Sequence, residues 1–182
     1  MDENTAIQLL RKHSTNEESY MKVLLHSQAV QKVAVQIANK ILKNPANRGM
    51  NIDIEFIRVA SLLHDIGRFK CPPGKESIKH GVTGGEIIRK EKIGEKYALV
   101  CENHMGAGIT KKEIVARALP IPAKDYIPTT NEEKIICYAD KLLWGTKVKP
   151  IEDIIARFNS EIGPEAGIRV KKLHDEIMKM IG

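Results

Sequence analysis

The residues best suited to chemistry lie between Arg58 and Lys70, in the stretch RVASLLHDIGRFK, where His64 and Asp65 are adjacent. The apolar residues before them predict a helix that carries both side chains in its last turn, with Gly67 as a left-handed residue that ends it. Burying an imidazole and a carboxylate without partners is costly. A divalent cation removes that cost, because aspartate oxygens and neutral histidine nitrogens are both metal ligands. The doublet therefore predicts a metal site.

Three further titratable residues, His26, His104 and Asp140, are each predicted on a helix face that is otherwise apolar. His80 follows the doublet on a separate predicted helix. A lone histidine on an apolar face is more often a hydrogen-bonded core residue than a ligand. Several such residues on separate inward faces are harder to explain in that way, so the candidate metal ligands are His26, His64, Asp65, His80, His104 and Asp140.

Helical periodicity and capping signals predict the elements that would position these residues. Helices are expected over residues 3–12, from a capping box at 14–17 to about 43, from 51 or 53 to 65, from about 77 towards 94, and from there to about 104. Further helices are expected from a capping box at 110–113 to about 119, from a capping box at 130–133 to 144, from 150, and over 165–180. The paired Gly84 and Gly85 cost about 1 kcal/mol each inside a helix, which predicts close approach of a neighbouring helix. No strand is expected, and the predicted fold class is all-α.

Two other features of the chain have alternative interpretations. The proline-rich segment 119–128 cannot be helical, and it is either a binding loop or a surface connection. His13 and His174 lie among polar and charged neighbours, and we expect both to be solvated.

Length and composition limit the classes of protein to which the chain can belong. Its 182 residues, 29% charged and 42% hydrophobic, predict one domain over 1–182 with a sizeable core. We expect no membrane span and no signal peptide, and hence a cytoplasmic location with three reduced cysteines. The net charge of +6 would suit nucleic acid or a phosphorylated small molecule, but we interpret it as a lysine-rich solvated surface. Because aromatic residues make up only 4%, with no basic run interleaved among them, a nucleic-acid partner is not expected.

The order of His26, the His64–Asp65 doublet and Asp140 on separate predicted helices resembles the HD superfamily of metal-dependent phosphohydrolases. The sequence HDIG at residues 64–67 matches one variant of its signature, and the resemblance covers about residues 23–144. It implies a compact helical bundle of HD-domain type. In that superfamily the corresponding residues hold one divalent metal, and here they are His26, His64, Asp65 and Asp140.

Subfamilies with two more histidines between the doublet and the last aspartate hold a second metal, bridged by the doublet aspartate. His80 and His104 stand at the corresponding places. The resemblance thus implies two divalent ions, with iron or manganese favoured by histidine-rich ligation and zinc, cobalt, nickel or magnesium as alternatives. Cyclic-dinucleotide branches carry adjacent histidines where this chain has Asn103–His104, so the chain looks more similar to small HD hydrolases of dinucleoside polyphosphates.

The resemblance implies hydrolysis of a phosphoester or phosphoanhydride, in a nucleotide or a similar small molecule, by metal-activated water. The expected catalytic residues are Asp65 and Arg68, since the arginine could neutralise charge on the phosphoryl group. Arg68 could also be a solvated arginine at a helix end. The expected substrate-binding residues are Arg68, Lys75, Lys79 and Lys141, although surface lysines need no function. A di-iron oxygenase of HD type and a metal-bearing sensor without turnover are the alternatives. The sequence does not indicate the oligomeric state.

Overall fold

Helices form almost all of the regular structure in the computed structural model, which describes residues 1–74 and 76–182. The α-helices are α1 (Glu3–His13), α2 (Glu17–Lys43), α3 (Ile54–Leu63), α4 (His80–Lys90), α5 (Glu95–Asn103), α6 (Lys111–Ala116), α7 (Asn131–Lys141), α8 (Ile151–Glu161) and α9 (Pro164–Ile181). Short 3-10 turns are η1 (Pro45–Asn47), η2 (Ile66–Phe69), η3 (Ser77–Lys79) and η4 (Met105–Ala107). The predicted all-α class is confirmed.

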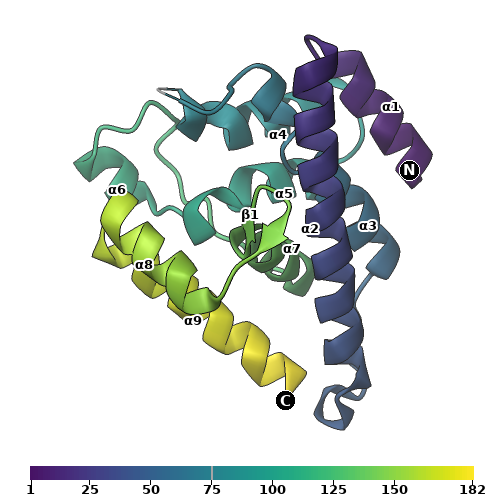
Figure 1. The fold of residues 1–182 in the computed structure, drawn as a ribbon, viewed down its shortest axis with the longest axis vertical. Coiled ribbons are helices and arrows are strands. Elements are labelled where there is room, and N and C mark those ends of the chain that lie inside the picture. The colour runs from purple at the N-terminus through teal and green to yellow at the C-terminus, as the bar shows by residue number, and fades with distance from the viewer. Residues whose placement is uncertain (75) are drawn as a thin grey trace.

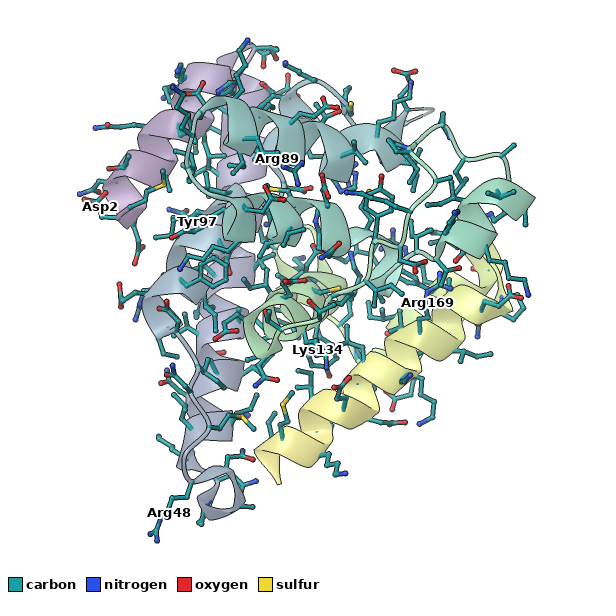
Figure 2. All side chains as sticks on the ribbon, turned by 180° about the vertical axis from the view of Figure 1, so that it is seen from behind. Asp2, Arg48, Arg89, Tyr97, Lys134 and Arg169 are labelled. Carbon is teal, nitrogen blue, oxygen red and sulfur yellow. The ribbon has the colours of Figure 1, made fainter. Side chains whose placement is uncertain are left out.

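The long α2 runs the length of the molecule, and α3 and α7 pack against it (Figure 1). Helices α4 and α5 pack on each other above α7, while α8 and α9 pack together at the lower left of the view. Lys134 of α7, labelled in Figure 2, pairs with Glu176 of α9, and Arg169 of α9 pairs with Glu113 of α6. These contacts join the elements that surround the centre of the bundle.

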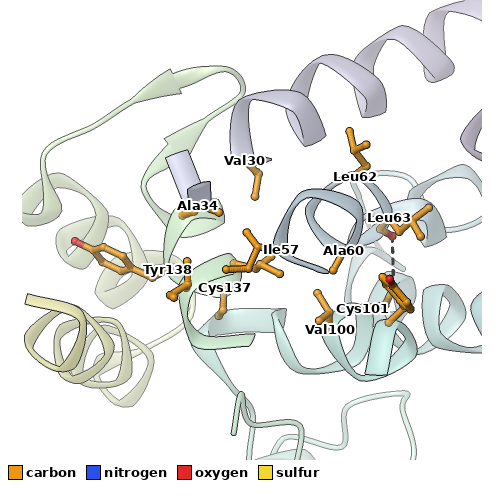
Figure 3. Close-up of a cluster of buried hydrophobic side chains, with 14 of the residues drawn as sticks. Val30, Ala34, Ile57, Ala60, Leu62, Leu63, Val100, Cys101, Cys137 and Tyr138 are labelled. Atoms are coloured by element: carbon orange, nitrogen blue, oxygen red, sulfur yellow. Dashed lines mark hydrogen bonds between the residues drawn. The ribbon is translucent and has the colours of Figure 1, made fainter. Parts of the chain in front are cut away.

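The apolar core lies where α2, α3, α5 and α7 meet, as Figure 3 shows. Val30 of α2, Ile57 of α3 and Cys137 of α7 are fully buried within it. The thiol of Cys101 on α5 donates to the carbonyl oxygen of Leu63 at 3.3 Å, the dashed line in Figure 3. The C-terminal end of α3 is therefore held against α5, just before the His64–Asp65 doublet.

Close packing, rather than a left-handed backbone, explains Gly67. We expected this residue to end the helix with a positive φ, but α3 ends at Leu63 and Gly67 lies inside η2 outside the left-handed region. A Cβ atom at Gly67 would lie 1.9 Å from the carbonyl oxygen of His80. At Gly84 a Cβ would lie 3.1 Å from the Cβ of Cys101, which confirms the predicted close approach of a neighbouring helix.

The N-terminus of α2 differs from its prediction by two residues. The capping box uses Asn16, whose side chain accepts from the amide of Ser19 at 2.8 Å, and the hydroxyl of Ser19 accepts from the amide of Asn16. The expected box at residues 14–17 is wrong because Glu17 pairs with Arg11 of α1 instead. The shift leaves the inward face of α2 unchanged.

The helix predicted from 130–133 to 144 begins as expected, with Thr130 as the N-cap of α7, but it ends earlier than predicted, at Lys141. The next residues form an antiparallel pair of strands, β1 (Leu143–Trp144) and β2 (Lys147–Val148), which the sequence analysis missed. Their turn contains Gly145 with φ of +64°. A short hairpin therefore stands beside the end of α7.

The segment 119–128 is non-helical, as predicted, and it folds over a second apolar cluster. Tyr126 is fully buried there with Met105, Ile109 and Ile114, and its hydroxyl donates to the carbonyl oxygen of Pro122 at 3.1 Å. Ile109 and Tyr126 form a two-way backbone bridge. These contacts identify a packed connection rather than an open loop.

Candidate metal centre

Six titratable side chains from five separate elements meet at the centre of the bundle. One belongs to α2, two follow α3, one begins α4, one follows α5 and one lies in the last turn of α7. The structure brings together the whole set expected from the sequence, His26, His64, Asp65, His80, His104 and Asp140. His80, which the sequence analysis did not place on an apolar face, is also buried.

One group of these residues surrounds the Oδ2 atom of Asp65. The Nε2 atoms of His26 and His64 lie 3.9 and 4.0 Å from it. Asp140 completes the group, because its Oδ1 lies 3.0 Å from His26 Nε2 and 3.7 Å from His64 Nε2. Two imidazole nitrogens and two carboxylate oxygens thus face a common point.

The second group surrounds the other oxygen of the same carboxylate. Oδ1 of Asp65 lies 3.4 Å from His80 Nε2 and 3.6 Å from His104 Nε2. The two Nε2 atoms of this group are 2.9 Å apart. Asp65 therefore stands between two clusters of nitrogen atoms and presents one oxygen to each.

Main-chain carbonyl groups orient all four imidazole rings. Each Nδ1 lies within hydrogen-bond distance of one carbonyl oxygen: that of Gly145 for His26 (2.8 Å), Ser61 for His64 (2.7 Å), Ser77 for His80 (2.5 Å) and Cys101 for His104 (2.7 Å). Because a carbonyl oxygen can only accept, each Nδ1 carries the hydrogen. In a neutral ring Nε2 is then bare, which is how proteins commonly prepare histidine for a metal.

The arrangement fits a divalent metal. The Nε2 atom of His64 is buried and has no hydrogen-bond partner among the residues that the structure describes. The Nε2 atoms of His80 and His104 are 2.9 Å apart. If both rings are neutral and carry their hydrogen on Nδ1, the lone pairs of these two nitrogens face and repel each other. A cation between the nitrogens and the carboxylates would satisfy all of these atoms, and nitrogen–oxygen sets of this kind suit transition metals.

Both aspartates are ionised at neutral pH. Burial raises the pKa of Asp65, but nearby positive charge, including that of Arg68, holds it well below its usual range. Burial likewise raises the pKa of Asp140, and the Lys141 ammonium and the hydrogen bond with His26 outweigh it. Two negative charges are therefore held inside the bundle.

The histidines differ in their protonation. Burial lowers the pKa of His80 to about 3 and also lowers that of His104, so both rings are neutral near pH 7. Burial lowers the pKa of His26 too, but the hydrogen bond to Asp140 and the charges of both aspartates raise it overall to about 9. A metal that binds His26 would thus displace a proton.

A cavity of about 460 Å³ opens over Asp65, His26 and Asp140. Its wall includes four cationic side chains, Lys22, Arg68, Lys141 and Arg157. Apolar lining is contributed by Val23, Pro73, Leu143, Trp144 and Phe158. The cavity is therefore polar and cationic beside the aspartates, with apolar side chains elsewhere in its wall.

Two of the four cations expected to bind substrate lie in this cavity. Arg68 donates through Nε to Asp65 Oδ1 at 3.2 Å and through Nη1 to Ser77 Oγ at 2.6 Å. Lys141 donates to Oδ2 of Asp140. The prediction for Lys79 is not supported, because its ammonium pairs with Glu76 and the described lining does not include it. Lys75 lies outside the described residues.

Sequence reasoning missed much of the cavity wall, including Lys22, Trp144 and Arg157. Lys22 lies one helical turn before His26, so helix periodicity could have identified it. Trp144 and Arg157 come from β1 and α8, and no local signal connects them with the doublet.

The two histidines expected to be solvated are partly buried and contact other parts of the chain. His13 Nε2 lies 2.9 Å from Glu91, and His174 Nδ1 lies 2.6 Å from the hydroxyl of Tyr138. The expectation failed because these partners are far away in sequence. Neither ring belongs to the two groups around Asp65.

Comparison with known proteins decides the family. The model of the HD domain matches residues 23–145, which is most of the chain and contains all six clustered residues. The chain belongs to the HD domain family. This result confirms the predicted relation to metal-dependent phosphohydrolases and supports hydrolase activity in general terms. The clustered histidines and aspartates are able to hold a divalent metal.

Relatives of this HD protein carry different names. A protein of Methanocaldococcus jannaschii, described as uncharacterised, is 42% identical over 161 residues, 87% of this chain and 89% of that protein. The tRNA (cytidine(56)-2'-O)-methyltransferases of Picrophilus torridus and Thermoplasma volcanium are each 32% identical over 181 residues, 100% of this chain and 48% of each enzyme. This chain thus spans about half the length of those two methyltransferases.

A solved structure agrees with the fold. The crystal structure of the HD domain of L. monocytogenes phosphodiesterase PgpH superposes with a TM-score of 0.53 and 17% identity, covering 97% of this chain and 96% of that one. Among the described residues, no helix combines the length and apolar character needed to cross a membrane. The cytoplasmic location stays a prediction.

Proposed function

We propose that this HD protein is a metal-dependent phosphohydrolase that cleaves a phosphoester or phosphoanhydride in a nucleotide or a similar small molecule. The observation that carries the proposal is the position of Asp65, whose two oxygens face two separate histidine groups beside a cationic cavity. A bridging carboxylate between two metals is a recurrent arrangement for hydrolysis of phosphate esters.

We assign one metal to His26, His64, Asp65 and Asp140, and a second to Asp65, His80 and His104. Iron or manganese suits this histidine-rich set with two carboxylates, and zinc, cobalt, nickel and magnesium are alternatives. When bound, such ions polarise a phosphoryl oxygen and lower the pKa of a water molecule towards neutrality.

The chain itself contributes orientation and positive charge. Carbonyl groups fix the four rings through Nδ1, so the Nε2 atoms point at the centre without rearrangement. Arg68 is anchored by Asp65 and Ser77, which holds its guanidinium at the cavity wall, where it would contact the phosphoryl oxygens. Lys141 holds Asp140 through Oδ2 and leaves Oδ1 facing the histidines.

The relatives named as tRNA methyltransferases favour a second candidate, in which the phosphorylated group belongs to an RNA. Methyl transfer itself is not assigned to this chain, because its cavity combines metal ligands and cations, which is the chemistry of phosphoryl transfer. A di-iron oxygenase remains the alternative of a different class, since histidine and carboxylate ligands also suit iron.

The test begins with metal content per chain in protein purified without oxygen. The same sample, supplied with Mn²⁺ or Fe²⁺, is then assayed for phosphate release from nucleotides, dinucleoside polyphosphates and tRNA. We expect two metals per chain and phosphate release from a nucleotide. Release from tRNA alone would favour the RNA candidate.

Two results would contradict the hydrolase. Oxygen consumption that depends on iron, without phosphate release, would identify an oxygenase. Stable metal binding without any turnover would favour a metal-bearing sensor.

A further inference from the structure

Trp144 is the only tryptophan of the sequence and lines the cavity that contains Asp65 and His26. Its side chain is 57% exposed. A single exposed apolar residue is ordinary on a protein surface. Here, however, the exposed indole borders the candidate metal centre, and aromatic walls beside a few polar groups are typical of small-molecule sites.

The hairpin that carries Trp144 is attached to a candidate metal ligand. Trp144 pairs with Lys147 across the strands, and the next residue, Gly145, begins the turn. The carbonyl oxygen of Gly145 lies 2.8 Å from Nδ1 of His26. One hydrogen bond therefore links the turn beside the indole to the metal centre, and it limits how far the ring can move from that centre.

Positive charge surrounds the indole ring. The guanidinium carbon of Arg157 lies 4.9 Å from the ring centroid, and the Lys149 ammonium lies 5.9 Å from it. Arg157 also lines the cavity. An anionic ligand with an electron-rich planar ring would meet both a stacking surface and favourable charge at this position.

The two parts of the cavity wall differ in chemistry. Arg68 and metals held by Asp65 and Asp140 would suit a phosphoryl group, whereas Leu143, Trp144 and Phe158 suit an apolar ring. Inorganic phosphate or a sugar phosphate would leave the aromatic part unused. The cavity wall thus offers partners both for a phosphate group and for a flat ring.

We infer that the nucleobase of a nucleotide substrate stacks on Trp144 beside Arg157, and that this ring site selects nucleotides over phosphoesters without a ring. The inference rests on the proposed hydrolase function and adds the residues that determine its substrate class.

The single tryptophan makes the inference directly measurable, because fluorescence excited at a wavelength that tryptophan absorbs and the four tyrosines do not reports on Trp144 alone. Metal-loaded protein is titrated with adenosine 5′-monophosphate, ribose 5-phosphate and inorganic phosphate. We expect saturable quenching with the nucleotide and little change with either ringless probe. No fluorescence change at a nucleotide concentration that saturates hydrolysis would overturn the inference.

Substitution gives a second measurement. Trp144→Leu removes one base–aromatic stack, so the KM for the nucleotide should rise roughly 10- to 100-fold relative to that for ribose 5-phosphate. Trp144→Phe should restore most of the preference. Val148→Ala, at an exposed apolar position on the same hairpin that does not line the cavity, is the matched control and should leave both KM values unchanged. An unchanged KM ratio in Trp144→Leu would refute the ring site.

The outcomes separate this inference from the proposed function. Absence of phosphate release from every substrate would refute the hydrolase, while the fluorescence titration would still report whether a nucleotide binds. Fluorescence that changes with protein concentration instead of nucleotide would show that Trp144 is covered by a second copy of the chain, which also overturns the inference.

Discussion

Asp65 has two oxygens with different neighbours, and this asymmetry separates the two halves of the candidate centre. Oδ2 faces His26 and His64, while Oδ1 faces His80 and His104. The carboxylate is ionised and buried, so its charge must be balanced locally. Substitutions at single residues can therefore test each half separately.

Asp65→Asn keeps the shape of the side chain and removes its charge. We expect loss of bound metal and a fall in activity of at least about 100-fold, because even residues behind the ligands commonly cost 10–100-fold. Metal content, phosphate release and circular dichroism measure the effect, and the helical spectrum should persist. Asp175→Asn, at an exposed aspartate paired with Lys171, is the control. Full metal content in Asp65→Asn would contradict the bridging role.

His80→Ala should remove about one metal of two, because it takes one of the two histidines from the group around Oδ1 of Asp65. The metal at His26, His64 and Asp140 should remain. Metal analysis per chain measures the change, with His13→Ala as a control outside the cluster. An unchanged metal count would reduce the centre to a single-metal site.

At the scale of elements, the 3-10 turn η2 and helix α4 approach so closely that their backbones almost touch. This approach brings His80 towards the doublet. It depends on Gly67, where a Cβ would meet backbone atoms of α4 that cannot rotate away.

Gly67→Ala should therefore lower the free energy of unfolding by about 1–3 kcal/mol or more, as overpacking does. Gly167→Ala is a matched control, because its Cβ would lie 2.0 Å from the Asn159 side chain, which is exposed and can move. Alanine inside a helix is about 0.5–1 kcal/mol better than glycine, so the control should be nearly neutral or stabilising. Urea denaturation of both variants measures the difference, and equal effects would contradict the argument.

At the scale of the whole molecule, the candidate ligands come from elements spread along the chain, so a bound metal would join α2, α3, α4, α5 and α7. A ligand that binds only the folded state at 100 times its Kd adds about 2.7 kcal/mol of stability. Removal of metal with a chelator should therefore lower Tm by about 5–10 °C for a chain of this size. The Asp65→Asn variant should show no such shift, and an equal shift in that variant would point to metal bound elsewhere.

The metal-free protein should lose stability as the pH falls from 7 to 4. The folded pKa of His80 is about 3, and burial also lowers the pKa of His104. As the pH falls below about 6.5, the unfolded chain therefore binds protons at these residues and the folded chain does not. Each such group contributes a slope of about 1.4 kcal/mol per pH unit. His26, with a folded pKa of about 9, opposes this trend between pH 7 and about pH 6, where its folded ring is already protonated and its unfolded ring is not fully so. At lower pH it is protonated in both states, and the fall in stability is then steepest.

Urea denaturation at several pH values measures this slope, and His80→Ala should make it shallower. A stability that stays constant between pH 7 and pH 4 would contradict the assigned burial of the two neutral rings.

The sequence by itself was enough to predict the all-α class and the HD family, both of which are confirmed. These depend on local signals: helical periodicity, caps and the adjacent His64 and Asp65. It also named the six clustered residues, whose role as ligands stays a prediction. Local signals failed at Gly67, at the hairpin after Lys141 and at His13 and His174, because contacts between distant segments decide those positions.

Only the tertiary structure decided how the six residues share Asp65, which carbonyl orients each ring, and that Lys22, Trp144 and Arg157 join Arg68 and Lys141 around one cavity. The physical reason is that periodicity determines which face of a helix turns inward. The distance between two inward faces depends on how closely whole elements pack, as the backbone contact at Gly67 illustrates.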